Sequence, residues 1–457
     1  MTQYLLLLPE ITLFVLGVIT FCYGFIRRES KHLWIFGLLT FAVSLAVAVV
    51  CFNHREFSAE AVKISEYKQL MRVFIFTIGL LVLVLSYEDL KKNVNKAAEY
   101  FFLLIISLFG MNIMIVANDL LILYLSLETF SLALYTLAGF YQKERVSVEA
   151  GLKYFILGTL SSVLLLACIA FLYGITGSTS YEILRSMKVE DFSFSLGVLF
   201  LVASFAFKLS LVPFHAWAPD VYQGAPTSVT AFFSTAPKVA VFSALINIFL
   251  SFSLQTKPEG LIIILSSLSM FLGNLLALRQ TNLKRMLAYS SIAHSGYMFM
   301  AFLLSDNLIV LSLIPYLIVY VFMNIGIFAV IISIKEETLN KYYGLGKYNP
   351  IVALCLIIIL FSFTGIPPTA GFVVKLNLFK NVFSAGYSEL VFFALLMSIL
   401  SAFYYLRVVF YLYKDAPINF KYNKNNITLA LALLCCIFLL LVGVLPDLIL
   451  FFFFKLW

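Results

Sequence analysis

Charge is scarce in this chain. Only 12% of its 457 residues are Asp, Glu, Lys or Arg, about half the ~25% usual in soluble proteins. Hydrophobic residues make up 62%, the mean hydropathy is +1.01, and the apolar runs are long enough to cross a bilayer, which excludes a soluble globular protein. The net charge of +8 does not indicate a nucleic-acid partner, because the basic residues lie in short loops between apolar runs. We predict an all-α polytopic membrane protein embedded in a lipid bilayer.

Motifs that bind metals, phosphates or dinucleotides are also missing. The six cysteines include no CxxC pair, which argues against a zinc site or an iron–sulfur cluster. The stretch from Gly344 to Lys347 lacks the GxxxxGK spacing of a phosphate loop, and no dinucleotide fingerprint or haem ligand set is present. We therefore expect no cofactor and no metal in this chain, and we expect any redox chemistry to occur in other chains.

Long apolar runs separated by charged or Gly/Pro-rich breaks predict about fourteen transmembrane helices. Two of them are unusually long because each contains a proline break, one at Pro213 and one at Pro367 and Pro368. The expected helices cover residues 4–26, 33–52, 70–87, 99–117, 119–141, 148–175, 194–221, 226–250, 260–278, 285–304, 308–333, 351–382, 388–413 and 428–454.

The loops between these helices differ in their content of lysine and arginine. Loops after odd-numbered helices hold seventeen of these residues, and the other side of the membrane, with the C-terminus, holds eight. Because positive residues are enriched in cytoplasmic loops, this bias predicts that both termini lie on the non-cytoplasmic side. An even number of helices is consistent with that orientation.

The expected helices form two sets of five, and the broken helix is the fourth of each set. An odd number of crossings forces the two sets to insert with opposite orientation, which is typical of inverted-repeat transporters with unwound segments near the midplane. Because the two sets share little residue identity, the repeat depends on pattern alone. We predict a three-helix segment over 1–98, a first repeat over 99–250, a second, inverted repeat over 260–413 and a C-terminal helix over 428–457.

Five ionisable residues lie within apolar stretches and away from the expected helix ends: Glu128, Lys153, Lys208, Lys238 and Lys375. A charge at bilayer depth costs at least ~2.5–3.5 kcal/mol, so such residues are functional candidates by default. Burial favours the neutral forms of Lys and Glu, and a nearby opposite charge favours the ionised forms, so a lysine balanced between the two can load and release a proton. The series therefore predicts proton relay. The alternatives are a structural ion pair for Glu128 and snorkelling to the membrane interface for the lysines.

Two histidines and one arginine extend the set of candidates. His215 follows the first proline break, and His294 lies within the tenth expected helix; histidine titrates near physiological pH, so both are candidate proton shuttles, and packing residues are the alternative. Arg407 is always charged, so we expect it to be structural or an anchor. Asp119 and Asp220 lie at helix ends, and we expect them to be caps or solvated.

Residues around the two breaks carry a specific resemblance. Lys208, Pro213 to His215 and the run from Ala218 to Thr227 resemble the signature of the antiporter-like membrane subunits of respiratory complex I. The stretch from Gly365 to Phe372 resembles the twelfth-helix break of that family, and the stretch from Leu152 to Ser162 resembles its N-type member. The resemblance covers most of the chain.

This resemblance implies a role for each candidate. Glu128 matches the fifth-helix glutamate that pairs with the seventh-helix lysine, here Lys208. Lys238 matches the lysine thought to connect two half-channels, and Lys375 matches the residue through which the proton is thought to leave. Lys153 matches a sixth-helix lysine of the N type.

The resemblance also implies the surroundings of the chain. We expect a proton-translocating subunit of NADH–quinone oxidoreductase in the bacterial cytoplasmic (inner) membrane. NADH, FMN, iron–sulfur clusters and quinone are expected in partner subunits, and the expected partners are other membrane subunits of complex I, including further antiporter-like subunits and small membrane subunits. Two alternatives stay open: a subunit of a multisubunit sodium/proton antiporter or membrane hydrogenase, and a structural scaffold that conducts nothing.

Overall fold

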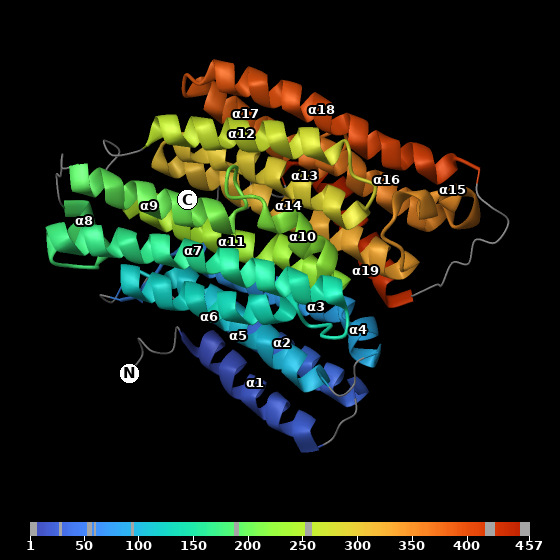
Figure 1. Ribbon diagram of the computed structural model, residues 1–457, viewed down its shortest axis with the longest axis horizontal. Helices are drawn as coiled ribbons and strands as arrows, with labels where there is room; N and C mark the ends of the chain where they lie inside the picture. Colours follow the sequence, from blue (N-terminus) through green and yellow to red (C-terminus); the bar gives the residue numbers. More distant parts are fainter. Residues whose placement is uncertain are drawn as a thin grey trace. The chain divides into compact units, whose positions relative to one another are not determined.

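The computed structural model of the chain describes residues 7–26, 30–52, 57–58, 61–92, 96–186, 192–251, 258–415 and 426–447 (Figure 1). Its described regular structure is helical except for a short antiparallel pair, Phe57–Ser58 (β1) with Lys63–Ile64 (β2), and three isolated bridges. Some expected features lie outside the described residues: 4–6 of the first helix, 448–454 of the last, and the basic loop residues Arg27, Arg28, Arg55, Lys188, Lys257, Lys421, Lys424 and Lys455.

The chain divides into two compact units. The first comprises Met1–Leu209 and Gly224–Pro258. At its centre α11 is buried along its whole candidate span, as expected for a helix with apolar residues on all sides, although it also contains Lys238 and Asn247. The helices of this unit are α1 (Leu8–Ile26), α2 (Ser30–Cys51), α3 (Glu66–Leu85), α4 (Tyr87–Lys92), α5 (Ala97–Val116), α6 (Leu120–Ala138), α7 (Arg145–Thr176), α8 (Tyr181–Ser186), α9 (Phe192–Lys208) and α11 (Thr227–Ser251).

The second unit comprises Ser210–Gln223 and Glu259–Trp457. Its short first segment therefore lies between the two segments of the first unit in the sequence. Its most buried long helix is α14, with 89% of its candidate span inside the protein. The unit holds α10 (Trp217–Gly224) apart from its last residue, α12 (Glu259–Ala277), α13 (Leu283–Phe299), η4 (Met300–Leu303), α14 (Asp306–Ile334), η5 (Leu339–Tyr342), α15 (Leu345–Tyr348), α16 (Pro350–Thr364), α17 (Ala370–Ser384), α18 (Ser388–Tyr413) and α19 (Asn426–Val444).

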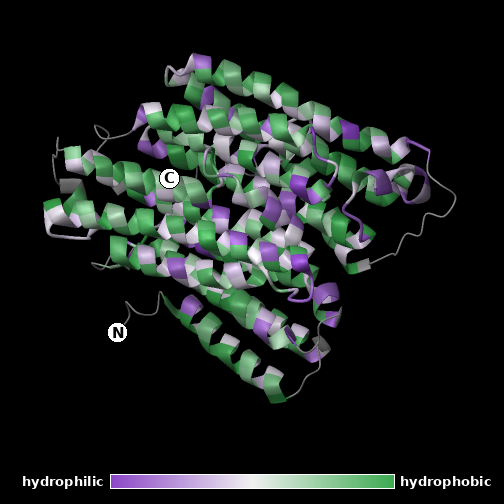
Figure 2. Cartoon of the chain, viewed as in Figure 1, coloured by the Kyte–Doolittle hydropathy of each residue, from purple (hydrophilic) through white to green (hydrophobic). Residues whose placement is uncertain are grey.

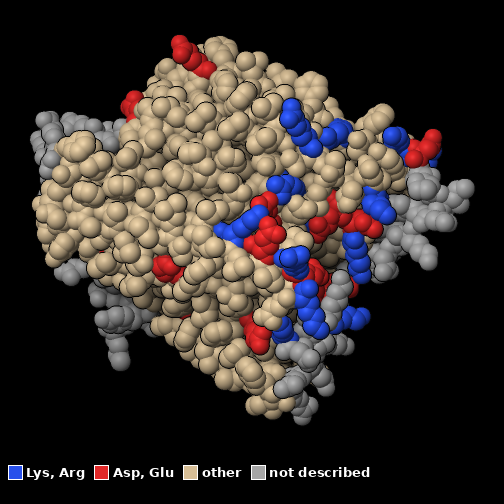
Figure 3. Space-filling view, in the orientation of Figure 1, with Lys and Arg blue, Asp and Glu red and all other residues tan. Residues whose placement is uncertain are grey.

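Within the described residues, eleven helices are long and apolar enough to cross a membrane. Three further expected spans correspond to shorter helices, namely α9 with α10, α13, and α16 with α17. Hydrophobic residues dominate the helices (Figure 2), and uncharged residues form most of the visible surface (Figure 3). Many large apolar side chains are exposed, as on α18, where Phe392, Leu396 and Phe403 are 61%, 60% and 64% exposed. The chain is a nearly all-helical, multi-pass membrane protein.

Both predicted breaks are confirmed. After α9 ends at Lys208, Ser210 adopts φ +59°, and helical structure resumes with α10. After α16 ends, Gly365 adopts φ +87°, a left-handed conformation that glycine adopts without a steric penalty, and α17 follows at Ala370. Each break leaves helix-end backbone groups that need partners within the protein, because lipid supplies none.

Candidate functional site

Lys208 lies at the C-terminal end of α9, and its ammonium is held by hydroxyl groups of α6. Nζ donates to Ser131 Oγ at 2.7 Å and to Tyr135 OH at 3.1 Å, and it also lies 5.4 Å from the centre of the Tyr135 ring. The side chain is only 6% exposed. Because the C-terminal end of a helix carries a partial negative charge, this position suits a cation. The predicted burial of Lys208 is confirmed.

Glu128 lies on the same helix as these hydroxyls. Positions 128, 131 and 135 are three and four residues apart, so their side chains share one face of α6. The Glu128 carboxylate accepts a hydrogen bond from Ser162 Oγ of α7 and makes no direct ion pair with Lys208 among the described contacts. The pairing implied by the resemblance is therefore indirect: the carboxylate lies one turn from the hydroxyl that holds the lysine.

A glycine makes room for this arrangement. A Cβ atom built on Gly158 of α7 would overlap the hydroxyl and ring of Tyr135. The ring of Tyr135 also contacts the ring of Tyr154, with centroids 4.8 Å apart. Tyr135 is thus fixed from the α7 side, and its hydroxyl points where Lys208 can reach it.

The other two candidate lysines of the first unit differ in their surroundings. Lys238 lies within the buried helix α11 and is 2% exposed, as predicted. Pro237 beside it lacks an N–H, so it removes one hydrogen bond of the helix at this depth. Lys153, in contrast, has a side chain that is 42% exposed and forms an ion pair with Glu149 at 2.7 Å, one turn earlier on α7. The expectation that Lys153 is buried is wrong in the structure of this chain.

Lys375 of α17 binds the end of α16 at the second break. Its Nζ donates to the main-chain oxygens of Phe363 at 2.9 Å and Thr364 at 3.0 Å, and to Ser398 Oγ of α18 at 3.2 Å. Phe363 and Thr364 are the last residues of α16, so the ammonium satisfies carbonyls that have no partner within their own helix. The side chain is buried, as predicted.

His294 and Lys375 contact the same residues, Tyr297 and Phe363. Nδ1 of His294 and the hydroxyl of Tyr316 are 3.0 Å apart, and its ring contacts Tyr297 and Phe363. Tyr297 lies under the Lys375 ammonium, at 5.1 Å from the ring centre. The structure thus brings His294 and Lys375 to a common aromatic cluster in the second unit.

His215 lies in the first break, before α10, and is half-buried. Its carbonyl accepts from Ala218 N at 3.0 Å, whereas its Nδ1 is buried and makes no hydrogen bond with any described residue. A buried ring nitrogen without a partner costs free energy unless water or another group reaches it. His215 is therefore the one histidine candidate with bonding capacity to spare in the described part of the chain.

Several other charged residues support helix ends. Arg407 donates to the carbonyls of Leu278 and Gln280, which follow the end of α12, so it is a structural anchor as predicted. Asp119 caps α6 by accepting from the N–H groups of Leu121 and Ile122, which also agrees with the prediction. Asp220, predicted to be a cap or solvated, instead forms an ion pair with Arg285 of α13.

Sequence reasoning missed the hydroxyl partners of the charged residues. Ser131 and Tyr135 follow Glu128 at helical spacing on a mostly apolar helix, and this pattern was the available signal. Ser162 and Ser398 belong to other helices, and nothing in the sequence connects them with Glu128 or Lys375. Among the described residues, no group of three His, Cys, Asp or Glu side chains could hold a metal ion.

Comparison with known proteins places this geometry in a family. The family described as "NADH:quinone oxidoreductase/Mrp antiporter, TM" matches residues 117–403. NADH-quinone oxidoreductase subunit N 2 of Thermodesulfovibrio yellowstonii is 60% identical over 456 residues, which cover 99% of this chain and 100% of the relative.

Two solved structures share the fold. One, titled "Respiratory complex I from Thermus thermophilus with bound Aureothin", contains a chain with 31% identity and a TM-score of 0.85 that covers 97% of this chain and 98% of its own length. The Mrp complex from a Dietzia species contains a chain with a TM-score of 0.86 that covers 98% and 95%, but at 20% identity it shows the fold alone. On the evidence of the family match and these relatives, the chain belongs to the NADH:quinone oxidoreductase/Mrp antiporter family of membrane proteins.

Proposed function

We propose that this chain is the N-type membrane subunit of a bacterial NADH–quinone oxidoreductase and that it moves protons across the membrane. The observation that carries the proposal is Lys208, a buried lysine held by two hydroxyls of α6 that lie about one and two helical turns from Glu128 on the same face. Burying a charged lysine is costly, and Lys208 has no direct ion pair among the described contacts; a proton relay needs partners that tolerate both protonation states.

The hydroxyls around Lys208 have this tolerance. A serine or tyrosine hydroxyl both donates and accepts hydrogen bonds, so Ser131 and Tyr135 can accept from the ammonium and donate to the lone pair of the neutral amine. The hydroxyl of Ser162 likewise donates to the carboxyl group of Glu128. Glu128, Lys208, Lys238, Lys375, His215 and His294 are the proposed relay residues, and Lys153 joins them only if a partner subunit covers its exposed side chain.

We further propose that the two units contain inverted repeats of five helices over 99–250 and 260–413, after a segment over 1–98 and before a C-terminal helix over 428–457. Matching backbone bridges support this. Asp119, the N-cap of α6, bridges to Ser180 after α7, and Asn282, the N-cap of α13, bridges to Thr338 after α14. Both α7 and α14 are followed by a C-cap residue in the left-handed conformation, Gly177 and Lys335.

The same register extends to side chains. Glu128 lies nine residues after the N-cap Asp119, and Ser291 lies nine residues after the N-cap Asn282. In the same way, Ser162 and Tyr320 each lie eighteen residues before the bridge partner of their unit, Ser180 or Thr338. Ser162 donates to Glu128, and the hydroxyl of Tyr320 donates to Ser291 at 2.8 Å. The hydrogen bond between the second and third helices of each repeat is thus kept while the residues differ.

The remaining parts of the proposal concern the surroundings. The even number of fourteen expected spans, together with the excess of basic residues in the loops after odd-numbered helices, supports termini on the non-cytoplasmic side by the positive-inside rule. The chain would act as one subunit of the enzyme complex, with NADH, FMN, iron–sulfur clusters and quinone bound by partner subunits. Further antiporter-like subunits and small membrane subunits are its proposed neighbours.

The test is NADH-driven proton pumping in membrane vesicles that contain the assembled complex. Lys208→Ala should abolish pumping at equal amounts of assembled complex, because the relay loses the group that takes up and releases the proton. Lys347→Ala is the matched control, since this lysine is exposed and lies outside the spans; it should pump like the wild type.

The alternatives give different results. If Lys208→Ala pumps normally, the lysines are structural and the chain is a scaffold. If subunits with iron–sulfur and quinone sites do not co-purify with the chain, an antiporter or hydrogenase complex replaces the proposed one. The N-type relatives by sequence favour NADH–quinone oxidoreductase over both.

A further inference from the structure

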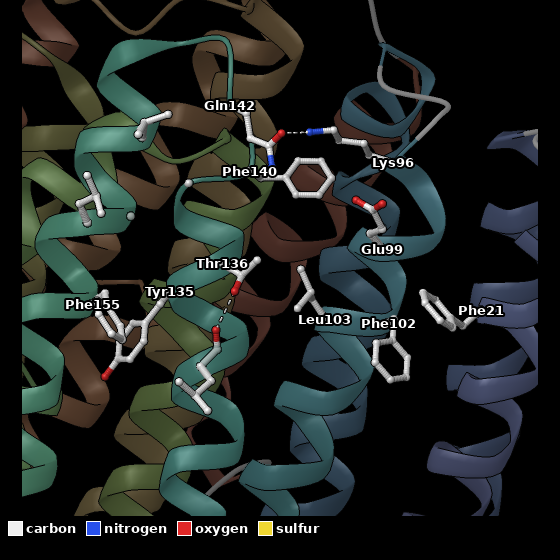
Figure 4. Close-up of a pocket in the computed structure, with 15 residues that line it drawn as sticks. Phe21, Lys96, Glu99, Phe102, Leu103, Tyr135, Thr136, Phe140, Gln142 and Phe155 are labelled. Atoms are coloured by element: carbon white, nitrogen blue, oxygen red, sulfur yellow. Dashed lines mark hydrogen bonds between the residues drawn. The ribbon is translucent and has the colours of Figure 1, made fainter. Parts of the chain in front are cut away.

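A cavity opens in the first unit between α1, α5, α6 and α7 (Figure 4). Its volume is about 690 Å³, within the ~300–1,000 Å³ typical of sites for small molecules. Phe21, Phe102, Leu103 and Phe155 form much of an apolar wall. Leu152, also in the lining, is 56% exposed, so the cavity borders an exposed apolar surface of the chain.

One end of the cavity is polar. Lys96, Glu99 and Gln142 gather there, where α5 begins and α6 has already ended (Figure 4). Lys96 Nζ donates to Gln142 Oε1 at 2.6 Å, and the Glu99 carboxylate makes no hydrogen bond or ion pair with any described residue. This end therefore offers one cation and one anion, and within the described part of the chain neither is paired with an opposite charge.

The depth of the cavity favours a lipid over a protein helix. Along α5 the lining residues run from Lys96 to Leu103, which is about 10 Å of helix at 1.5 Å per residue. A transmembrane helix of a partner would need a groove along the ~30 Å hydrocarbon core. A lipid instead places a polar head at the interface and an apolar chain directly below it, which matches the order of polar and apolar residues in the cavity.

We infer that this cavity binds a zwitterionic phospholipid with an amine-bearing head group. The phosphate lies at Lys96, the ammonium lies at Glu99, and the first part of one acyl chain lies against Leu103 and Phe155. The loops at this end, around Lys96 and Lys143, are rich in basic residues, so the lipid belongs to the leaflet on that side.

The site also borders the lysine site described above. The ring of Tyr135 lines the cavity, while its hydroxyl points away from Leu103 and Phe102 and accepts the hydrogen bond from Lys208 at 3.1 Å (Figure 4). The acyl chain therefore contacts the ring that positions Lys208. The inference itself does not rest on proton transport, because lipid binding is measured without it.

The test uses phosphatidylethanolamine with a photoreactive acyl chain, in vesicles that contain the assembled complex. We expect crosslinks to peptides of α5, α6 and α7. Leu103→Trp fills the cavity and should reduce these crosslinks to background. Leu125→Trp makes the same change at a 59% exposed leucine of α6 outside the cavity, and it should label like the wild type.

Two charge variants test the head group and do not depend on the packing of a tryptophan. Lys96→Gln should weaken labelling by phosphatidylethanolamine and by phosphatidylglycerol about fivefold, the size of an exposed ion pair. Glu99→Gln should weaken labelling by phosphatidylethanolamine alone, because phosphatidylglycerol has no ammonium group.

Three results would overturn the inference. Equal labelling of Leu103→Trp and wild type means that the probe reports bulk lipid. Absence of crosslinks to these helices in the assembled complex means that a partner subunit fills the cavity. Phosphatidylglycerol labelling as strong as that of phosphatidylethanolamine, with no effect of Glu99→Gln, contradicts a zwitterionic ligand.

Discussion

The two lysines beside the broken helices are held by different chemistry. Lys208 precedes its break and contacts two side-chain hydroxyls, whereas Lys375 follows its break and contacts two main-chain carbonyls and one hydroxyl. Carbonyls only accept hydrogen bonds, so the site of Lys375 suits the donors of an ammonium group, and the site of Lys208 suits either form of the amine. The same residue type beside the same kind of helix break is thus held in surroundings that accept both protonation states in one unit and in surroundings that favour the charged form in the other.

The largest expected effect comes from arginine at the two lysine positions. Arg cannot release its proton, but it donates well to carbonyls. Lys208→Arg should lower NADH-driven pumping by roughly a hundredfold, the lower end of what a positioned proton-transfer group contributes. Lys375→Arg should lower it less. Equal losses at equal assembly would show that both lysines must deprotonate, and the contrast between the sites would disappear.

The next largest effect is expected from substitution of Gly365, the glycine at the second break. Gly365→Ala places a Cβ at φ +87° and 3.0 Å from Lys375 Cδ. Left-handed strain costs roughly 1–2 kcal/mol, and crowding adds about 1 kcal/mol or more. The control is Gly177→Ala, at φ +68° with nothing within 4 Å, which carries the strain alone. Denaturant unfolding of the purified chain in detergent measures the loss of unfolding free energy in both variants. Equal losses would mean that the Lys375 side chain moves away from the added Cβ without a cost in free energy.

Single hydroxyl deletions sharpen the contrast further. Tyr135→Phe removes one of two acceptors of Lys208 and should cost about 1.5 kcal/mol, the lower value for bonds to charged groups. Ser398→Ala removes the longest of three bonds to Lys375 and should cost less, because both carbonyls remain. The same unfolding measurement ranks them. A larger loss for Ser398→Ala would show that the carbonyls contribute little.

The smallest effect is expected at a lysine outside the membrane. Lys347 and Asp415 form an ion pair at 2.8 Å, but both side chains are largely exposed. Hydrogen bonding to Lys347 lowers the pKa of Asp415, and hydrogen bonding to Asp415 raises the pKa of Lys347. The pair's contribution therefore disappears only when pH falls through the lowered carboxyl pKa or rises through the raised amine pKa.

Between about pH 5 and 8 both groups stay charged, so the difference in thermal midpoint between Asp415→Asn and the wild type should be flat and close to zero. Thermal melts across that range check this. A clear slope would indicate that the pair is buried by a partner, and exposure could then no longer separate this lysine from Lys208 and Lys375.

Much of this architecture could be predicted from the sequence because apolar runs and helix breakers are local signals. The breaks at Pro213 and Pro368, and the burial of Lys208, Lys238 and Lys375, follow from a lysine or a proline within a long apolar run. These signals need no knowledge of neighbouring helices.

The partners of these residues could not be predicted in the same way. Ser162 holds Glu128 and Ser398 holds Lys375 across helix contacts that sequence spacing does not encode. The exposure of Lys153, in contrast, has a local signal. Glu149 lies four residues earlier, and such a pair is typical of an exposed helix surface, but the apolar residues around Lys153 favoured the prediction that it is buried.

The segment Ser210–Gln223 has a consequence for the order in which the protein is made. Its contacts lie later in the chain: Val212 N donates to Ser269 Oγ, 57 residues on, and Asp220 pairs with Arg285, 65 residues on. At ~5–20 residues per second, a ribosome needs roughly 3–13 s to supply them. During that interval the newly inserted break lacks the groups that satisfy it in the finished protein, so the insertion machinery must shelter it from lipid until α12 and α13 arrive.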